Sequence, residues 1–281
     1  MLFHDARIYQ IVFLSLFLGV GIATRDWSLQ PLMIGTLFAT CCSVQWFASV
    51  YLTATPPLQS LPSALITALG LSVLLRADHV STLVLAGAFA MLSKVWLRVQ
   101  GKHIFNPGNF GIVAALTLTQ DAWVSPGQWG EEGWYVLLFL GAGGLVLGRV
   151  GRWDTSAAFL AAYASLEAIR NVWLGWTWDV WAHRLMSGSL LMFALFMITD
   201  PRTIPNARMG RLIWAAAIAL LTFFLRNVWF ISTAPFWALF ALAPLTILID
   251  RLFPSERFTW EERSLAADDK EAITDALLPA A

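Results

Sequence analysis

Charged residues are scarce in this sequence, and their scarcity excludes an ordinary soluble domain. Only 13% of the 281 residues are Asp, Glu, Lys or Arg, and 58% are hydrophobic, whereas soluble domains carry about 25% charged residues. Apolar runs of about 18 residues or more are typical of transmembrane helices. Such runs recur along the whole chain, so we expect an all-α, polytopic membrane protein.

The sequence also has few cysteines and no net charge. The formal charge is zero, so no nucleic-acid partner is expected. The only two cysteines, Cys41 and Cys42, are adjacent, and neighbouring cysteines seldom form a disulfide. Their spacing matches no zinc or iron–sulfur motif, so we predict free thiols and no metal site. No nucleophile–base pair is recognisable either, so we predict no catalytic residues, and any enzymatic role would consist of carrying electrons or ions.

The apolar runs number about ten and form two groups of five. At about 20 residues each, they leave no room for a separate soluble catalytic domain. We predict one transmembrane domain over residues 1–250, with halves at about 1–130 and 131–250, and a polar cytoplasmic tail at 251–281. The segments are about 8–24, 31–53, 59–75, 80–97, 105–119, 133–150, 156–174, 177–198, 211–228 and 231–249.

Lysine and arginine are distributed unevenly between the two sides of the predicted bundle. With ten spans both termini lie on one side, whose loops and helix ends carry eight Lys and Arg residues against four on the other. Cytoplasmic loops carry the excess of positive charge. The first segment also lacks a small-residue cleavage site, so we interpret it as a retained helix. We expect a multi-pass protein of the bacterial inner membrane with both termini in the cytoplasm.

The stretch GKHIFNPGNFG, residues 101–111, interrupts the apolar pattern. The apolar segment that begins there would extend about 22 Å as a helix, less than the hydrocarbon thickness of about 30 Å. Pro107 removes a backbone donor near its start, and irregular backbone at membrane depth is tolerated only where protein buries it or water lines it. We predict a short helix beginning at Asn106, with Asn106, Pro107 and Asn109 beside a ligand or transport pathway.

A second Asx–Pro pair, Asp200-Pro201, lies 94 residues after Asn106-Pro107. Interrupted segments in matching halves point to a binding site between structural repeats, so we predict that Asp200 and Pro201 line the same pathway. The halves share no convincing residue-by-residue similarity beyond this pair. The alternative is that each pair only begins a helix after a loop, since Asn and Asp are good N-caps and Pro suits the first turn.

Charged side chains inside the predicted spans are further candidates, because insertion of each costs about 2.5–3.5 kcal/mol. Glu167 and Arg170 lie three residues apart on one helix face, where they can form an ion pair. His183, Arg184 and Ser187 follow in the eighth segment, and histidine is a residue type that can handle protons. Each set either lines the pathway or is structural near the membrane edge.

Three stretches together resemble the NqrB/RnfD family. They read SALITALGLSVLL at 63–75, then GKHIFNPGNFGI, then GSLLMFALFMITDPRTIP, in the family's order over about residues 60–210. Its members are membrane subunits of the sodium-pumping NADH:quinone oxidoreductase and of the Rnf electron transport complex. The resemblance implies two related five-helix halves, similar to urea and ammonium channels, with broken or short segments near the two Asx–Pro pairs, and a role in redox-driven ion translocation.

Members of the family that this chain resembles also carry FMN, attached to a threonine that follows the Phe-Asn-Pro segment. Here the corresponding region reads DAWVSPGQWGEEGW, and no threonine lies between Gln120 and Arg152. The covalent FMN is therefore not carried over, and a flavin (FMN or riboflavin) would be non-covalent. This version of the region looks more like stand-alone RnfD-like proteins, including members found in enediyne biosynthetic clusters.

Three functions remain open. The first is electron-transport-linked movement of an ion or small molecule, alongside other Rnf-like membrane subunits in the lipid bilayer. The second is a channel or transporter that kept the fold without a redox partner. The third is an accessory subunit, for which Gly144 and Gly148 offer a packing face, since their GxxxG spacing is typical of helix association in membranes.

Overall fold

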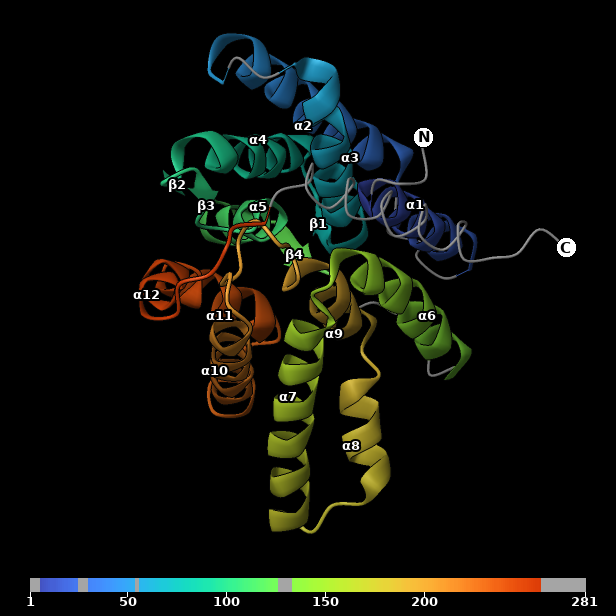
Figure 1. The fold of residues 1–281 in the computed structure, drawn as a ribbon. Helices are drawn as coiled ribbons and strands as arrows, with labels where there is room; N and C mark the ends of the chain where they lie inside the picture. The colour runs from blue at the N-terminus through green and yellow to red at the C-terminus, as the bar shows by residue number, and fades with distance from the viewer. Residues whose placement is uncertain (1–5, 25–29, 54–55, 126–132, 259–281) are drawn as a thin grey trace, which may run out of the picture.

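The structure is a computed structural model that describes residues 6–24, 30–53, 56–125 and 133–258. It is predominantly helical, which confirms the predicted all-α class (Figure 1). The helices are α1 (Ala6–Thr24), α2 (Pro31–Tyr51), α3 (Pro57–Leu74), α4 (Val80–Trp96), α5 (Pro107–Leu118), α6 (Gly133–Val150), α7 (Trp153–Trp173), α8 (Trp178–Leu185), α9 (Gly188–Met192), the π-helix η1 (Phe193–Met197), α10 (Arg208–Asn227), α11 (Ala234–Leu242) and α12 (Leu245–Leu252).

Two short antiparallel sheets, which the apolar pattern did not predict, connect helix ends. One pairs β1 (Leu75–Ala77) with β4 (Ala122–Val124), and the other pairs β2 (Arg98–Val99) with β3 (Lys102–His103). In the second sheet, Gln100 and Gly101 both have positive φ, at 51° and 81°. That geometry matches the two-residue turns that suit the twist of a hairpin. The hairpin carries the start of the interrupted stretch GKHIFNPGNFG.

Each of the ten predicted apolar segments contains a helix, but two segments are bent. The eighth contains α8 followed by α9 and η1 at an angle of 52°, and the tenth contains α11 and α12 at 53°. Within the described residues, α2, α3 and α10 are long and apolar enough to cross a membrane, and counting each bent pair as one span raises the number to five. The number of ten spans therefore stays a prediction.

Proline marks the start of several helices. The first turns of α2, α3, α5 and α11 each carry a proline. Proline is tolerated there because the first backbone N–H groups of a helix have no intrahelical acceptor. These residues therefore fix where the helices begin, and Pro107 sets the start of the short helix α5.

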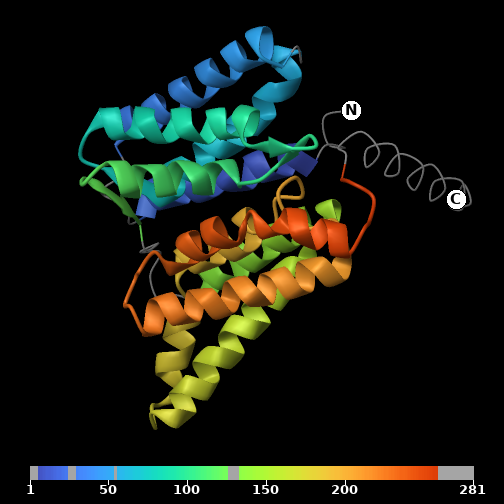
Figure 2. The same ribbon diagram turned by 90° about the vertical axis from the view of Figure 1, so that its left-hand side faces the viewer.

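The two groups of five segments pack in the same order. In the first group, α1 packs on α3, α2 packs on α3 and α4, and α4 packs on α5. In the second, α6 packs on α9 and η1, α7 packs on α8, η1 and α10, and α10 packs on α11. Figure 2 shows the first group above the second. The groups meet where α1 contacts α6 and where α5 contacts α11.

Large apolar side chains stay exposed along the outside of the bundle. Leu58 is 75% exposed, and Tyr51 and Leu137 are both 71% exposed. A soluble monomer rarely exposes so much contiguous apolar surface, whereas a membrane protein turns such side chains toward lipid. The interior holds rings such as Phe159 and Trp214. Cys41 is buried and Cys42 partly buried, and both are free as predicted.

Candidate functional site

A cavity of about 360 Å³ lies between the two groups of helices. The first group supplies its wall from α1 to α5 and from β2 and β3, and the second from α6, α9, η1 and the segment after η1. Both Asx–Pro pairs border it: Asn106, Pro107, Asp200 and Pro201 are all lining residues. Sites at the interface of related halves are common in membrane transport proteins, so this cavity is the candidate site.

Asn106 closes the N-terminus of α5 and connects the two Asx–Pro pairs. Its Oδ1 accepts a hydrogen bond from the backbone N–H of Asn109 at 3.0 Å, which makes it an N-cap. Its Nδ2 donates to the carbonyl oxygen of Met197 at 3.2 Å and to Oδ2 of Asp200 at 3.4 Å. The structure thus brings together residues 94 positions apart in the sequence.

Asp200 does not begin a helix, because α10 starts only at Arg208. Its Oδ1 accepts from the backbone N–H of Arg202 at 3.1 Å, and its carbonyl oxygen accepts from Thr203 Oγ1 at 3.2 Å. Burial raises the pKa of Asp200, although its backbone hydrogen bond to Arg202 works in the opposite direction. Asn106 therefore begins a helix and also lines the cavity, whereas Asp200 organises the turn that follows η1.

Asn109 lies outside the cavity. Its side chain is 1% exposed, and its Nδ2 donates to the carbonyl oxygen of Phe236 in α11 at 3.1 Å. Its Oδ1 is buried with no hydrogen-bond partner among the described residues. Asn109 therefore connects α5 of the first group to α11 of the second group. It does not line the cavity that both Asx–Pro pairs border.

Five basic residues of the cavity were not predicted as site residues, among them Arg7 of α1. Lys94 of α4 is 7% exposed, and its Nζ donates to Ser63 at 2.9 Å (Oγ) and 3.3 Å (carbonyl O). Arg98, His103 and Arg202 also line the cavity. Burial, with help from these nearby cations, lowers the pKa of His103 to about 2, so the ring is neutral. For Lys94, Arg98 and His103 the signal in the sequence is the basic run that precedes Asn106.

The charged residues of the seventh and eighth segments form a separate cluster. Arg184 Nη1 donates to Glu167 Oε2 at 3.1 Å, and Asn227 Nδ2 donates to Glu167 Oε1 at 2.8 Å. Glu167 thus pairs with Arg184 of α8 rather than with Arg170, the partner that the spacing predicted. Arg170 instead lies over the ring of Trp176, 4.6 Å from its centroid. None of these residues lines the cavity.

His183 and Ser187 also lie away from the cavity. His183 is exposed on α8, and Ser187 precedes α9 with its Oγ 3.0 Å from that of Ser189. In Figure 1 α7 and α8 extend together away from the remaining helices. The contacts among Glu167, Arg184 and Asn227 join α7, α8 and α10 outside the cavity.

We expect Glu167→Gln to destabilise the junction of α7, α8 and α10. Glu167 is 2% exposed and Arg184 loses its carboxylate partner, so the cost should be about 1–3 kcal/mol, the range for a charge-assisted hydrogen bond. Thermal unfolding of the detergent-purified protein measures the change. Arg170→Gln is the matched control on the same helix, and equal midpoints for both variants would show that the Glu167 pair contributes nothing.

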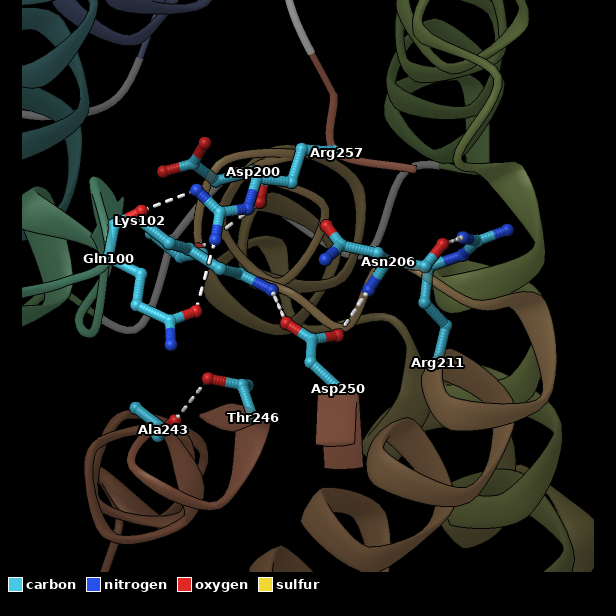
Figure 3. A network of polar contacts seen from close by, with 10 residues as sticks. Gln100, Lys102, Asp200, Asn206, Arg211, Ala243, Thr246, Asp250 and Arg257 are labelled. Carbon is cyan, nitrogen blue, oxygen red and sulfur yellow. Dashed lines mark hydrogen bonds and ion pairs between the residues drawn. The ribbon is translucent and has the colours of Figure 1, made fainter. Parts of the chain in front are cut away.

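A second polar network connects the β2–β3 hairpin to the second group of helices (Figure 3). Lys102 forms an ion pair with Asp250 of α12, whose Oδ1 accepts from the backbone N–H of Asn206 at 2.8 Å. The carbonyl oxygen of Asn206 accepts from Arg211 Nη1 at 2.6 Å. Arg211 in turn forms a forked pair with Asp154 of α7. The chain of contacts therefore runs from the first group through α12 and α10 to α7.

Comparison with known proteins identifies the family. The sequence profile of the NQR2, RnfD, RnfE family matches residues 119–259, half of the chain. The chain belongs to this family. The resemblance predicted from the three sequence stretches is thereby confirmed, and with it a membrane protein.

The similar curated proteins share one description, the D subunit of an ion-translocating oxidoreductase complex. The protein of Stutzerimonas stutzeri is 34% identical over 128 residues, which cover 46% of this chain and 36% of that protein. The protein of Halorhodospira halophila is 31% identical over 119 residues, covering 42% and 33%. That of Tolumonas auensis is 32% identical over 100 residues, covering 34% and 29%. The chain thus spans about a third of the length of these relatives in each match.

The residues after α5 do not fit a covalently attached FMN. No threonine lies between Gln120 and Arg152, and residues 126–132 of this region lie outside those that the structure describes. The preceding Thr119 belongs to the end of α5, where its Oγ1 donates to the carbonyl oxygen of Ala115 at 2.8 Å. The region between Gln120 and Arg152 therefore offers no threonine to which FMN could be attached.

Proposed function

We propose that this protein is an RnfD-like subunit of an ion-translocating, electron-transport complex of the bacterial inner membrane. Other Rnf-like membrane subunits would be its partners, and both termini would face the cytoplasm. Its transported ion or small solute would pass between the two five-helix halves through the cavity beside Asn106 and Asp200. The role rests on the family and on the names of the relatives; the path rests on the cavity.

The observation that carries the proposed path is the meeting of two helix ends at the cavity. The N-terminus of α5 and the C-terminus of η1 both lie at the cavity, and the side chain of Asn106 donates hydrogen bonds to Met197 and Asp200. Helix termini leave unpaired backbone groups that can take up a ligand or ion in place of water. The matching order of helix packing in the two groups supports a repeated architecture of the kind found around such paths.

We expect Asn106→Ala to abolish most donor-dependent ion movement. The variant loses the N-cap, a cost of about 1 kcal/mol, and also the amide that contacts Asp200. Membrane vesicles from producing cells, supplied with an electron donor and loaded with a sodium- or pH-sensitive dye, measure the flux. Asn106→Ser separates the two effects, because serine keeps a cap but lacks the amide donor.

The matched control is Arg208→Gln, which lies outside the cavity with a side chain 69% exposed. It should retain the parental flux. Parental flux in Asn106→Ala and Asn106→Ser as well would remove the cavity from the transport path, while loss in both with normal folding would support it.

A non-redox channel or transporter is the second candidate, favoured by the absence of the family's threonine motif after α5. The absorption spectrum of the purified protein distinguishes the two. A non-covalent flavin released on denaturation supports electron transport. A colourless protein that moves solute in liposomes without an electron donor supports the second candidate instead.

A further inference from the structure

The cavity carries an excess of positive charge. Lys94, Arg98 and Arg202 line it, and Asp200 is the acidic residue among its described lining side chains. No carboxylate of the described residues forms an ion pair with any of the three cations, although ion pairs occur elsewhere in the bundle. A cation inside a membrane protein is expensive unless an opposite charge or several acceptors compensate it. The charge of Asp200 acts on Lys94 and Arg202, but one carboxylate does not balance three cations, so the cavity keeps a net positive charge that favours an anion.

The buried ring of His103 is a second indication that the cavity holds a ligand. The side chain of His103 is 6% exposed and lines the cavity, and its Nδ1 is buried without a hydrogen-bond partner among the described residues. Buried polar atoms are nearly always paired in proteins, so an unpaired one calls for a ligand or water. The ring lies next to the three cations, whose charges act on it.

One side of the wall is apolar, although polar residues such as Gln10, Gln45 and Ser63 line other parts of it. Val146 and Leu147 of α6 and Phe196 of η1 face the same cavity as the cations. The volume of about 360 Å³ lies within the range of sites for small organic molecules. A bare inorganic ion would leave this apolar wall uncovered, whereas a molecule with an apolar body would cover it.

We infer that the cavity binds an organic anion, with a carboxylate or phosphate head among Lys94, Arg98 and Arg202 and an apolar body against α6 and η1. This inference rests on the proposed function in that it assigns a ligand class to the proposed path. The head group can belong to a soluble anion or to an anionic lipid, which share this chemistry.

The test is calorimetric titration of the full chain, in nanodiscs of phosphatidylcholine, with phenyl phosphate and with benzyl alcohol. The two probes share a ring and differ in charge. We expect phenyl phosphate to bind saturably and benzyl alcohol to bind at least about tenfold more weakly. Equal binding of the two probes, or no binding of phenyl phosphate, overturns the inference.

Variants locate the binding. Arg98→Gln and Arg202→Gln should each weaken phenyl phosphate binding by about tenfold, since each removes a charge-assisted hydrogen bond. Arg202 is exposed at the cavity rim, so its substitution leaves the fold intact. Arg208→Gln is the control and should bind as the parent does. Parental affinity in both cavity variants overturns the inference.

Repeating the titration in nanodiscs that contain phosphatidylglycerol distinguishes the two sources of the head group. Weaker apparent binding of phenyl phosphate there identifies a lipid competitor, and unchanged binding identifies a soluble anion. The measurement needs no transport. Binding without any flux in vesicles would therefore support the anion site and contradict the proposed function. Flux without binding would support the proposed function and contradict the anion site.

Discussion

Arg211→Met is expected to lower the thermal unfolding midpoint more than any other single substitution considered for this chain. Arg211 and Asp154 are each 5% exposed, and the guanidinium binds both carboxylate oxygens, through Nε at 3.1 Å and Nη2 at 2.5 Å. Removing one partner of a buried pair leaves the other charge uncompensated, at a cost of about 3–5 kcal/mol. The change also removes the hydrogen bond to the carbonyl oxygen of Asn206.

The control is Arg208→Met. Arg208 approaches the same carboxylate at 3.9 Å but its side chain is 69% exposed, so its loss should cost at most about 1 kcal/mol. The double variant Asp154→Asn with Arg211→Met should recover part of the midpoint, because no buried charge is then left alone. Equal midpoints for the two single arginine variants would contradict a structural role for the buried pair.

Gly111→Ala is expected to be the second most damaging change, because α4 and α5 pack with their backbones in contact there. A Cβ at Gly111 would lie 2.5 Å from the carbonyl oxygen of Ala86 and 3.0 Å from Cβ of Ala90. Neither atom is the end of a flexible side chain, so α5 must move. Overpacking of this kind costs about 1–3 kcal/mol, and moving α5 displaces Asn106 at the cavity.

The matched control is Gly144→Ala on α6, where no heavy atom among the described residues lies within 4 Å of the new Cβ. Alanine in a helix is favoured over glycine by about 0.4–1 kcal/mol at such sites, so the midpoint should stay or rise slightly. Thermal unfolding and the vesicle flux assay measure both variants. A parental midpoint and flux for Gly111→Ala would contradict the close approach of α4 and α5.

The sequence predicted the helices better than their contacts. Apolar runs located the ten segments, because each run must bury its backbone polar groups in a helix when surrounded by lipid. The same runs missed the bend before Gly188 and the one at Pro244, since an average over many apolar residues does not register a local break. They also missed the short sheets, which need only a few paired residues at helix ends.

The candidate site was predicted in part. The meeting of Asn106 with Asp200 followed from two repeated interruptions, and the structure places them within hydrogen-bond distance. The partner of Glu167 did not follow, because Arg184 is 17 residues away on another helix and spacing reveals only neighbours on the same one. A Cβ added at Gly144 or Gly148 would meet no heavy atom within 4 Å among the described residues, so a packing face for another subunit stays a prediction there, whereas Gly143 lies against Leu195.

The π-helix η1 determines the direction in which the chain enters the cavity. Its hydrogen bonds close over one residue more than those of an α-helix, and one residue corresponds to a rotation of about 100° around the axis. The wider turn frees carbonyl groups that side chains then satisfy, as Ser156 does for Ala194 at 2.5 Å. The extra residue therefore sets the rotation of the chain that follows η1. Removing one residue from 193–197 would turn Asp200 away from Asn106 without altering a single polar side chain.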